Sequence, residues 1–311
     1  MDFKKLFIAG FVTCVSLSAL HAQTGKEFSI PLNTLKSWAD APVAALKVKI
    51  AGHSGIHPVQ NDCEMHLGGK VPGYAGDPDG WVLEPMNVCV EPLPGTANYP
   101  KTAWLRYGDS VKNATVKATG IVRIWPEHLT SSGASNPAHA LELHPLLTLA
   151  AGGTSHDFAK LVYAPEGFPG GLKPETAANI LTGTTVSVSE TGGTVTVDFE
   201  SGRIGNFSTF SVRMLLDTTE DVNGSHRLDG EVILSPTQKA PVRLLTAAGS
   251  DINATVARLM QGGRKSATFD LLVLFSLDPV ALYRAAKESN GQSVQVSKPI
   301  QLIVYGEGQP E

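Results

Sequence analysis

Short runs in which apolar and polar residues alternate dominate the chain, and this period of two predicts a mainly β protein. Gly120 lies in the middle of the longest run, where a glycine is typical of a bulge or a sharp bend. Pro145 interrupts the last run of the first half, which favours an edge strand or a strand end. The strands predicted in this half are residues 45–52, 63–69, 80–86, 114–125 and 139–150.

The number and length of these strands indicate a small β-domain. Five strands in about 105 residues, one of them bent, favour an OB-like β-barrel over residues 45–150. An open sandwich is the alternative. Residues 23–44 would precede the barrel as an N-terminal extension, and the glycine- and proline-containing stretch 151–171 would follow it as a linker.

The second half, residues 172–311, predicts a second β-rich domain, either α+β or a β-sandwich. Three helices are expected, each with a capping residue, a proline or an early glutamate at its start and a glycine at its end: residues 173–183, 250–263 and 278–291. Seven strands are expected around them: residues 184–190, 193–199, 208–216, 228–235, 240–247, 267–277 and 299–306.

The N-terminus predicts export. Lys4 and Lys5 precede an apolar run of about 15 residues, and "LHA" supplies a processing site before Gln23. This run is shorter than the ~20 residues of a spanning helix. Residues 1–22 are therefore predicted to be a bacterial signal peptide, which directs the chain to the periplasm or the extracellular space. No later segment approaches spanning length.

Charge narrows the possible partners. The formal net charge is −4, and lysines and arginines do not cluster. This distribution carries no strong nucleic-acid signature, because duplex binding requires a basic surface. A small ligand, including an anion, or a partner in the cell envelope remains compatible with it.

Two cysteines, Cys63 and Cys89, remain after the predicted processing. In an oxidising compartment such a pair most often forms a disulfide, which we expect here. The alternative is a Cys/His metal site with His66, although zinc sites usually pair cysteines at shorter spacing.

Acidic and imidazole side chains recur at a spacing of two residues. In "NDCEMHLGG" strand alternation would place Asp62, Glu64 and His66 on one face. In "ALELHPLL" it would place Glu142 and His144 together, and Glu84 lies on a third predicted strand. If these strands are neighbours, the set could bind zinc, manganese or iron, could provide a general base, or could form an internally paired polar face.

Four pieces of the first half resemble a family of small exported bacterial proteins of unknown function. They are "NDCEMHLGG", "WVLEPMNVC", "ATGIVRIWPEH" and "LELHPLL", in the family's order and over about a third of the chain. The resemblance implies an OB-like domain and brings no established activity. It implies recurring site candidates at five positions: Asp62, His66, Glu84, Glu142 and His144.

Two function classes follow as hypotheses, with a purely structural envelope protein as a third. The first is a ligand- or partner-binding module, in which Trp81 and Trp125 would be aromatic platforms and His128 would lie beside the site. The alternative role of these tryptophans is barrel core. The second is a metal-dependent hydrolase, acting on phosphodiesters for example, in which Asp62 or Glu84 would activate water. Its metal, such as zinc or manganese, would be bound by Glu64, His66, Glu142 and His144.

Overall fold

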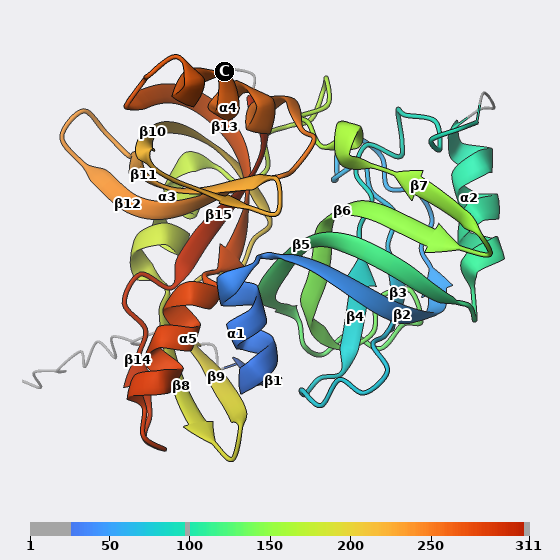
Figure 1. Ribbon diagram of the computed structural model, residues 1–311, viewed down its shortest axis with the longest axis horizontal. Helices are drawn as coiled ribbons and strands as arrows, with labels where there is room; N and C mark the ends of the chain where they lie inside the picture. Colours follow the sequence, from blue (N-terminus) through green and yellow to red (C-terminus); the bar gives the residue numbers. More distant parts are fainter. Residues whose placement is uncertain (1–25, 97–99, 308–311) are drawn as a thin grey trace, which may run out of the picture.

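The computed structural model describes residues 26–96 and 100–307 (Figure 1). The predicted signal peptide, residues 1–22, lies outside the described residues. The chain is mainly β, as predicted, and it forms two closed five-stranded barrels and one small sheet. Among the described residues, no helix has the length and apolar character needed to cross a bilayer.

The first barrel follows an OB-like connectivity. Its first strand pairs with the second and the fourth, and its third and fifth strands run parallel where Val82 pairs with Glu142 and so close the barrel. Helix α2 (Pro100–Val111) connects the third strand to the fourth. The five strands are β2 (Val43–His53), β3 (Leu67–Lys70), β4 (Gly80–Leu83), β5 (Thr115–His128) and β6 (His139–Ala151).

Gly120 bends β5 as predicted, because the pairing of β5 with β6 shifts register on both sides of it. A Cβ atom at this position would lie 2.7 Å from the carbonyl oxygen of Pro145, so only glycine allows this approach. The prediction for Pro145 was wrong in one respect. β6 is a central strand, since it pairs with β5, β4 and β7 (Thr154–Asp157), and the proline is accommodated at the register shift.

The second barrel repeats the connectivity of the first. Its first strand pairs with the second and the fourth, and its third and fifth strands are parallel. Helix α4 (Asp251–Gln261) again connects the third strand to the fourth. The strands are β10 (Phe207–Val222), β11 (Ser225–Ile233), β12 (Lys239–Thr246), β13 (Ser266–Leu277) and β15 (Ile300–Glu307). The second half is therefore an OB-like barrel with added elements, and the predicted sandwich alternative is wrong.

A small antiparallel sheet joins the first described strand to the second half. β1 (Lys26–Pro31) pairs with β9 (Thr194–Ser201), which pairs with β8 (Thr185–Thr191), and β14 (Val294–Gln295) completes the sheet. Residues 26–31 of the predicted extension thus belong to this sheet, and the rest of its described part forms α1 and the start of β2. The predicted linker also contains structure, namely β7 and a 3-10 helix (Ala159–Leu161).

All three predicted helices are present: α3 (Pro174–Gly183), α4 and α5 (Pro279–Glu288). Ser250 caps α4 by accepting a hydrogen bond from the Asn253 amide, and Asp278 caps α5 by accepting one from the Val280 amide. The sequence pattern did not predict α1 (Leu32–Asp40), which packs beside α5, or α2.

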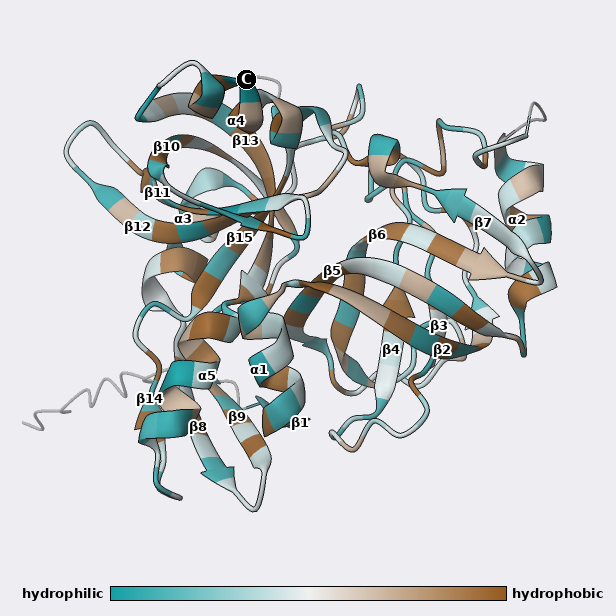
Figure 2. Cartoon of the chain, in the orientation of Figure 1, coloured by the Kyte–Doolittle hydropathy of each residue, from teal (hydrophilic) through white to brown (hydrophobic). Residues whose placement is uncertain are grey.

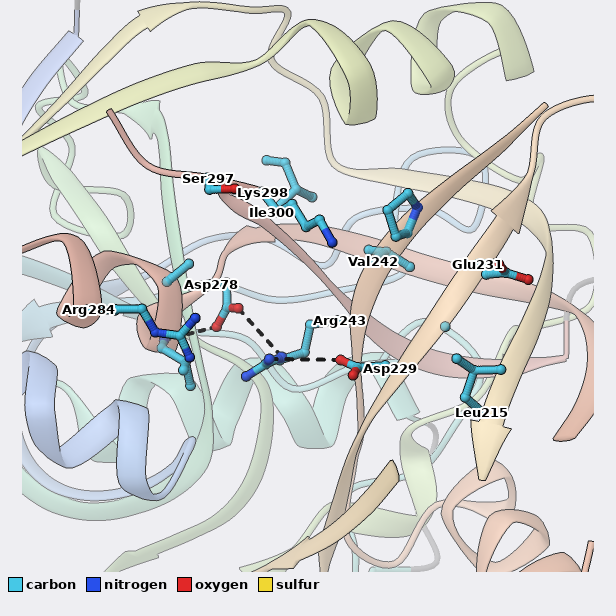
Figure 3. Close-up of a pocket in the computed structure, with 14 residues that line it drawn as sticks. Leu215, Asp229, Glu231, Val242, Arg243, Asp278, Arg284, Ser297, Lys298 and Ile300 are labelled. Carbon is cyan, nitrogen blue, oxygen red and sulfur yellow. Dashed lines mark hydrogen bonds and ion pairs between the residues drawn. The ribbon is translucent and has the colours of Figure 1, made fainter. Parts of the chain in front are cut away.

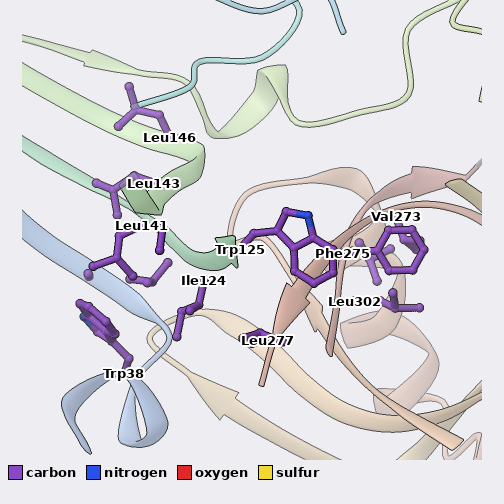
Figure 4. Close-up of a cluster of buried hydrophobic side chains, with 14 of the residues drawn as sticks. Trp38, Ile124, Trp125, Leu141, Leu143, Leu146, Val273, Phe275, Leu277 and Leu302 are labelled. Carbon is purple, nitrogen blue, oxygen red and sulfur yellow. The ribbon is translucent and has the colours of Figure 1, made fainter. Parts of the chain in front are cut away.

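A continuous hydrophobic core connects the two barrels (Figure 4). The Trp125 ring of β5 stacks on Phe275 of β13, with ring centroids 6.2 Å apart. Beside it, the Ile124 amide donates a hydrogen bond to Ser276 Oγ at 3.1 Å. Figure 2 shows that hydrophobic residues concentrate along the central strands of both barrels. The barrels therefore share one interior.

Candidate functional site

The acidic and imidazole residues predicted to converge do so at the seam where β4 and β6 close the first barrel. Glu84 directly follows β4, and Glu142 and His144 lie on β6. The predicted strand 63–69 begins only at Leu67, so Asp62, Glu64 and His66 lie in the preceding loop. Even so, Glu64, Glu84, Glu142 and His144 are all buried, with 1–3% of each residue exposed.

His144 is the centre of this cluster because both of its ring nitrogens face carboxylates. Nε2 lies 2.8 Å from Glu64 Oε1, whereas Nδ1 contacts Glu84 and lies 3.3 Å from Glu142 Oε2. Burial alone would lower the pKa of His144. The charges of Glu64 and Glu84 outweigh this effect and hold that pKa well above its ordinary value. Both ring nitrogens of His144 therefore face carboxyl groups, and the raised pKa favours the charged form of the ring.

The other cation of the cluster, Arg123 on β5, was not among the residues predicted from the sequence. Its Nη1 donates to Glu142 Oε2 at 2.8 Å, and His139 Nε2 lies 3.2 Å from the other oxygen of Glu142. Burial would raise the pKa of Glu142, but the charge of Arg123 and the two histidines hold it well below its ordinary value. Arg123 is the one charge within the apolar run "IVRIW", and this was the available signal.

Arg123 also reaches into the second barrel. Its Nε donates to the carbonyl oxygen of Phe275 at 2.9 Å, and its Nη2 donates to Asn206 Oδ1 at 2.6 Å. The guanidinium carbon lies 5.8 Å from the ring centroid of Trp125. One side chain with 1% exposure thus connects the acidic cluster of the first barrel to the backbone of the second.

A half-exposed extension of the cluster lies in the loop before β3. His57 Nδ1 lies 2.8 Å from Asp62 Oδ1, and the rings of His57 and His66 meet edge to face at 4.6 Å. His66 Nε2 in turn lies 3.4 Å from Glu84 Oε1. Asp62, predicted to activate water, is therefore paired with His57, a residue that the sequence analysis did not select.

The residues predicted as a binding surface are differently placed. Trp81 and Trp125 have 0% and 1% of their surface exposed, so neither offers a free ring, and the platform prediction is corrected to the core alternative. Trp81 packs edge-to-face against Trp38 and Tyr74. His128 is partly exposed and stacks on His139 with ring centroids 5.0 Å apart.

The predicted disulfide between Cys63 and Cys89 is present. It joins the loop that carries Asp62, Glu64 and His66 to the segment that follows β4. The amide of Val88 adds a hydrogen bond to the carbonyl oxygen of Cys63 at 2.9 Å. The loop is thereby held against the strand end from which Glu84 projects.

Two cavities lie away from the cluster, on the second half of the chain. One, of about 420 Å³, is walled by β11, β12 and the segment from α5 to β15 (Figure 3). The other, of about 1030 Å³, lies between the turn-rich stretch 164–175 and strands β10 and β13. None of Glu64, Glu84, Glu142 and His144 lines either cavity.

No family model matches the chain, and no curated protein or solved structure is similar to it. The resemblance of its first half to exported bacterial proteins therefore stays a prediction. The convergence of the predicted residues is observed, whereas the roles assigned to them as ligands or catalytic groups also stay predictions. Chemically, the buried part of the cluster is an internally paired network with two cations and three carboxyl groups.

Replacement of Arg123 tests how much the charge of this arginine contributes to the stability of the network. Arg123→Met leaves Glu142 buried without its strongest partner, so the free energy of unfolding should fall by about 3–5 kcal/mol. The double variant Arg123→Met/Glu142→Gln should lose clearly less than the sum of the two single variants, because no unpaired charge remains. Urea denaturation measures all three, with Asp79→Asn, which removes the exposed Lys70–Asp79 pair, as control. A loss below 1 kcal/mol in Arg123→Met would contradict the account.

Glu64 should give the folded protein a distinct pH dependence. Burial raises its pKa to about 8, from an ordinary 4.5. The folded state therefore holds this proton more tightly than the unfolded state, and the stabilisation is complete below pH 4.5 and is lost as the pH rises through 8. Glu64→Gln, which cannot ionise, should lose less stability than the wild type between pH 5 and 8. Parallel profiles in denaturant titrations at several pH values would refute this assignment.

Proposed function

We propose that the protein is an exported binding protein that holds a small anionic ligand in the 420 Å³ cavity of its second barrel. Export is supported by the predicted signal peptide and by the disulfide, which is typical of oxidising compartments. The proposal keeps the binding function expected from the sequence. It moves the ligand from the first barrel to the second, because Trp81 and Trp125 are buried.

The walls of the cavity support a ligand site. β11 and β12 are the second and third strands of the barrel, and the segment from α5 to β15 connects the fourth strand to the fifth. OB barrels bind ligands on the face of these two strands and at the adjoining loops. A shared fold does not establish a shared ligand, so the charges in the cavity must indicate what binds there.

Two cations without partners carry the proposal. Arg243 is neutralised, since it lies 3.8 Å from Asp229 and 3.6 Å from Asp278 (Figure 3). Arg284 and Lys298 also line the cavity, and neither has an ion pair or hydrogen bond from its side chain within the described ranges. An anion would complete this set.

The rest of the lining suits a ligand with an apolar body. Leu215, Val242 and Ile300 contribute apolar surface beside the charged groups. A ligand site of this mixed kind fixes orientation with a few polar groups and gains affinity from apolar contact. We therefore assign the site to a small organic carboxylate or phosphate rather than to an inorganic ion.

The hydrolase alternative has weaker support. A substrate would have to reach carboxylates and an imidazole that are no more than 3% exposed. Their charges are also already compensated, by Arg123 and by His144 itself. The buried cluster is better explained as a paired polar layer between the two barrels than as a reaction centre.

Charge reversal in the cavity tests the proposed function. Glucose 6-phosphate and glucuronate are suitable anionic probes, with glucose as the neutral match, in isothermal titration calorimetry. The wild type should bind an anion and not glucose, and Arg284→Glu/Lys298→Glu should weaken that binding at least tenfold. Lys287→Glu is the matched control, since Lys287 lies on the same helix and does not line the cavity. Equal binding of glucose, no binding of either anion, or full affinity in the double variant would contradict the proposal.

A further inference from the structure

The loop before β3 carries a second constellation, independent of the cavity in the second barrel. One ligand atom each from His57, Asp62 and His66 lies within 4.8 Å of the others. Ligands around a zinc ion, at bond lengths of about 2.0–2.2 Å, lie roughly 3–4 Å apart. The three side chains therefore need only a small adjustment to share an ion.

We propose that His57, Asp62 and His66 form a three-ligand site for a divalent transition metal, with zinc as the best match. Two imidazole nitrogens and one carboxylate oxygen are a donor set that zinc accepts, whereas calcium and magnesium prefer oxygen donors alone. His57 Nδ1 and Asp62 Oδ1 lie 2.8 Å apart, a distance at which they share a proton. Binding of the metal would release it.

Exposure distinguishes this set from the buried cluster. The side chains of His57, Asp62 and His66 are 28%, 19% and 14% exposed, so an ion can enter and keep a position for water. Glu142, in contrast, is buried. Arg123 already supplies a positive charge there at 2.8 Å, and a second cation would be repelled.

The loop is held in the shape that the site needs. The Ser54 amide donates to the carbonyl oxygen of His66, and the His66 amide donates to Ser54 Oγ, both at 2.9 Å. The His57 amide donates to the carbonyl oxygen of Glu64 at 2.9 Å. These cross-loop bonds place His57 opposite His66, and the disulfide at Cys63 fixes the stretch between Asp62 and Glu64. A preorganised loop reduces the ordering that metal binding would otherwise require.

A carboxylate behind the site supports the same assignment. Glu84 Oε1 lies 3.4 Å from Nε2 of His66, and a metal-bound histidine commonly donates its second ring N–H to such a group. Glu84 is therefore a positioning residue that orients the His66 ring. It is not one of the three ligands.

Zinc binding to the tag-free protein, with its disulfide intact, tests the proposal. Isothermal titration calorimetry with zinc chloride, and metal analysis after dialysis, should give close to one zinc per chain for the wild type. His57→Gln and Asp62→Asn should each weaken the affinity at least 100-fold, with folding checked by circular dichroism. His53→Gln is the matched control, because His53 forms an ordinary His–Asp pair with Asp109 at 3.1 Å.

A second readout keeps the test decisive. Cobalt(II) added to the wild type should give visible d–d absorption bands that are lost in Asp62→Asn. Three results would overturn the proposal: no zinc bound to the folded wild type, unchanged affinity in both His57→Gln and Asp62→Asn, or loss of binding in His128→Gln instead. The last result would move the site to the other group, His128, His139 and Glu142.

Discussion

The structure depends on one buried guanidinium. Arg123 lies at the junction of the two barrels with 1% of its surface exposed, and it donates to Glu142 in the first barrel and to Phe275 and Asn206 in the second. A charge removed from water is tolerated only when it is paired and its donors are satisfied. Each barrel therefore supplies part of the environment that the arginine requires, and neither can satisfy it alone.

The same constraint explains the polar network between the two barrels. Glu142 contacts His139 and His144, and both ring nitrogens of His144 in turn contact carboxyl groups. The network ends in the half-exposed loop at His66, where charge can meet solvent or an ion. The second barrel, built on the same connectivity, carries a charged cavity away from this network, between β11, β12 and the segment from α5 to β15.

Much of this could be predicted from local patterns. The three helices with a capping residue or an early proline were found, and so were the β-barrel of the first half, the bend at Gly120 and the disulfide. Alternation indicated that Glu142 and His144 share a face, and convergence with Glu84 was expected if the strands were neighbours. Glu64 joins them from a loop, which alternation did not predict. Helix α1 was missed because no side chain caps its start, which follows Pro31 directly.

Other features depend on contacts that no local pattern reveals. Gly68 and Gly69 looked like the end of a strand, yet they lie inside β3, where a Cβ would come within 2.4 Å of a neighbouring carbonyl oxygen in each case. The duplicated barrel connectivity leaves no repeat in the sequence, because pairing partners and not residue identities define it. The role of Arg123 depends on packing between distant segments, although a lone arginine in an apolar strand indicated a buried charge. The His57–Asp62 pair depends on the shape of its loop.

Scanning calorimetry of the full chain tests the central claim most directly. If the barrels share one interior through Arg123 and Trp125, the protein should unfold in a single transition whose calorimetric and van't Hoff enthalpies agree. Two separate transitions, each with the enthalpy of a single barrel, would show that the barrels fold independently and would contradict the account.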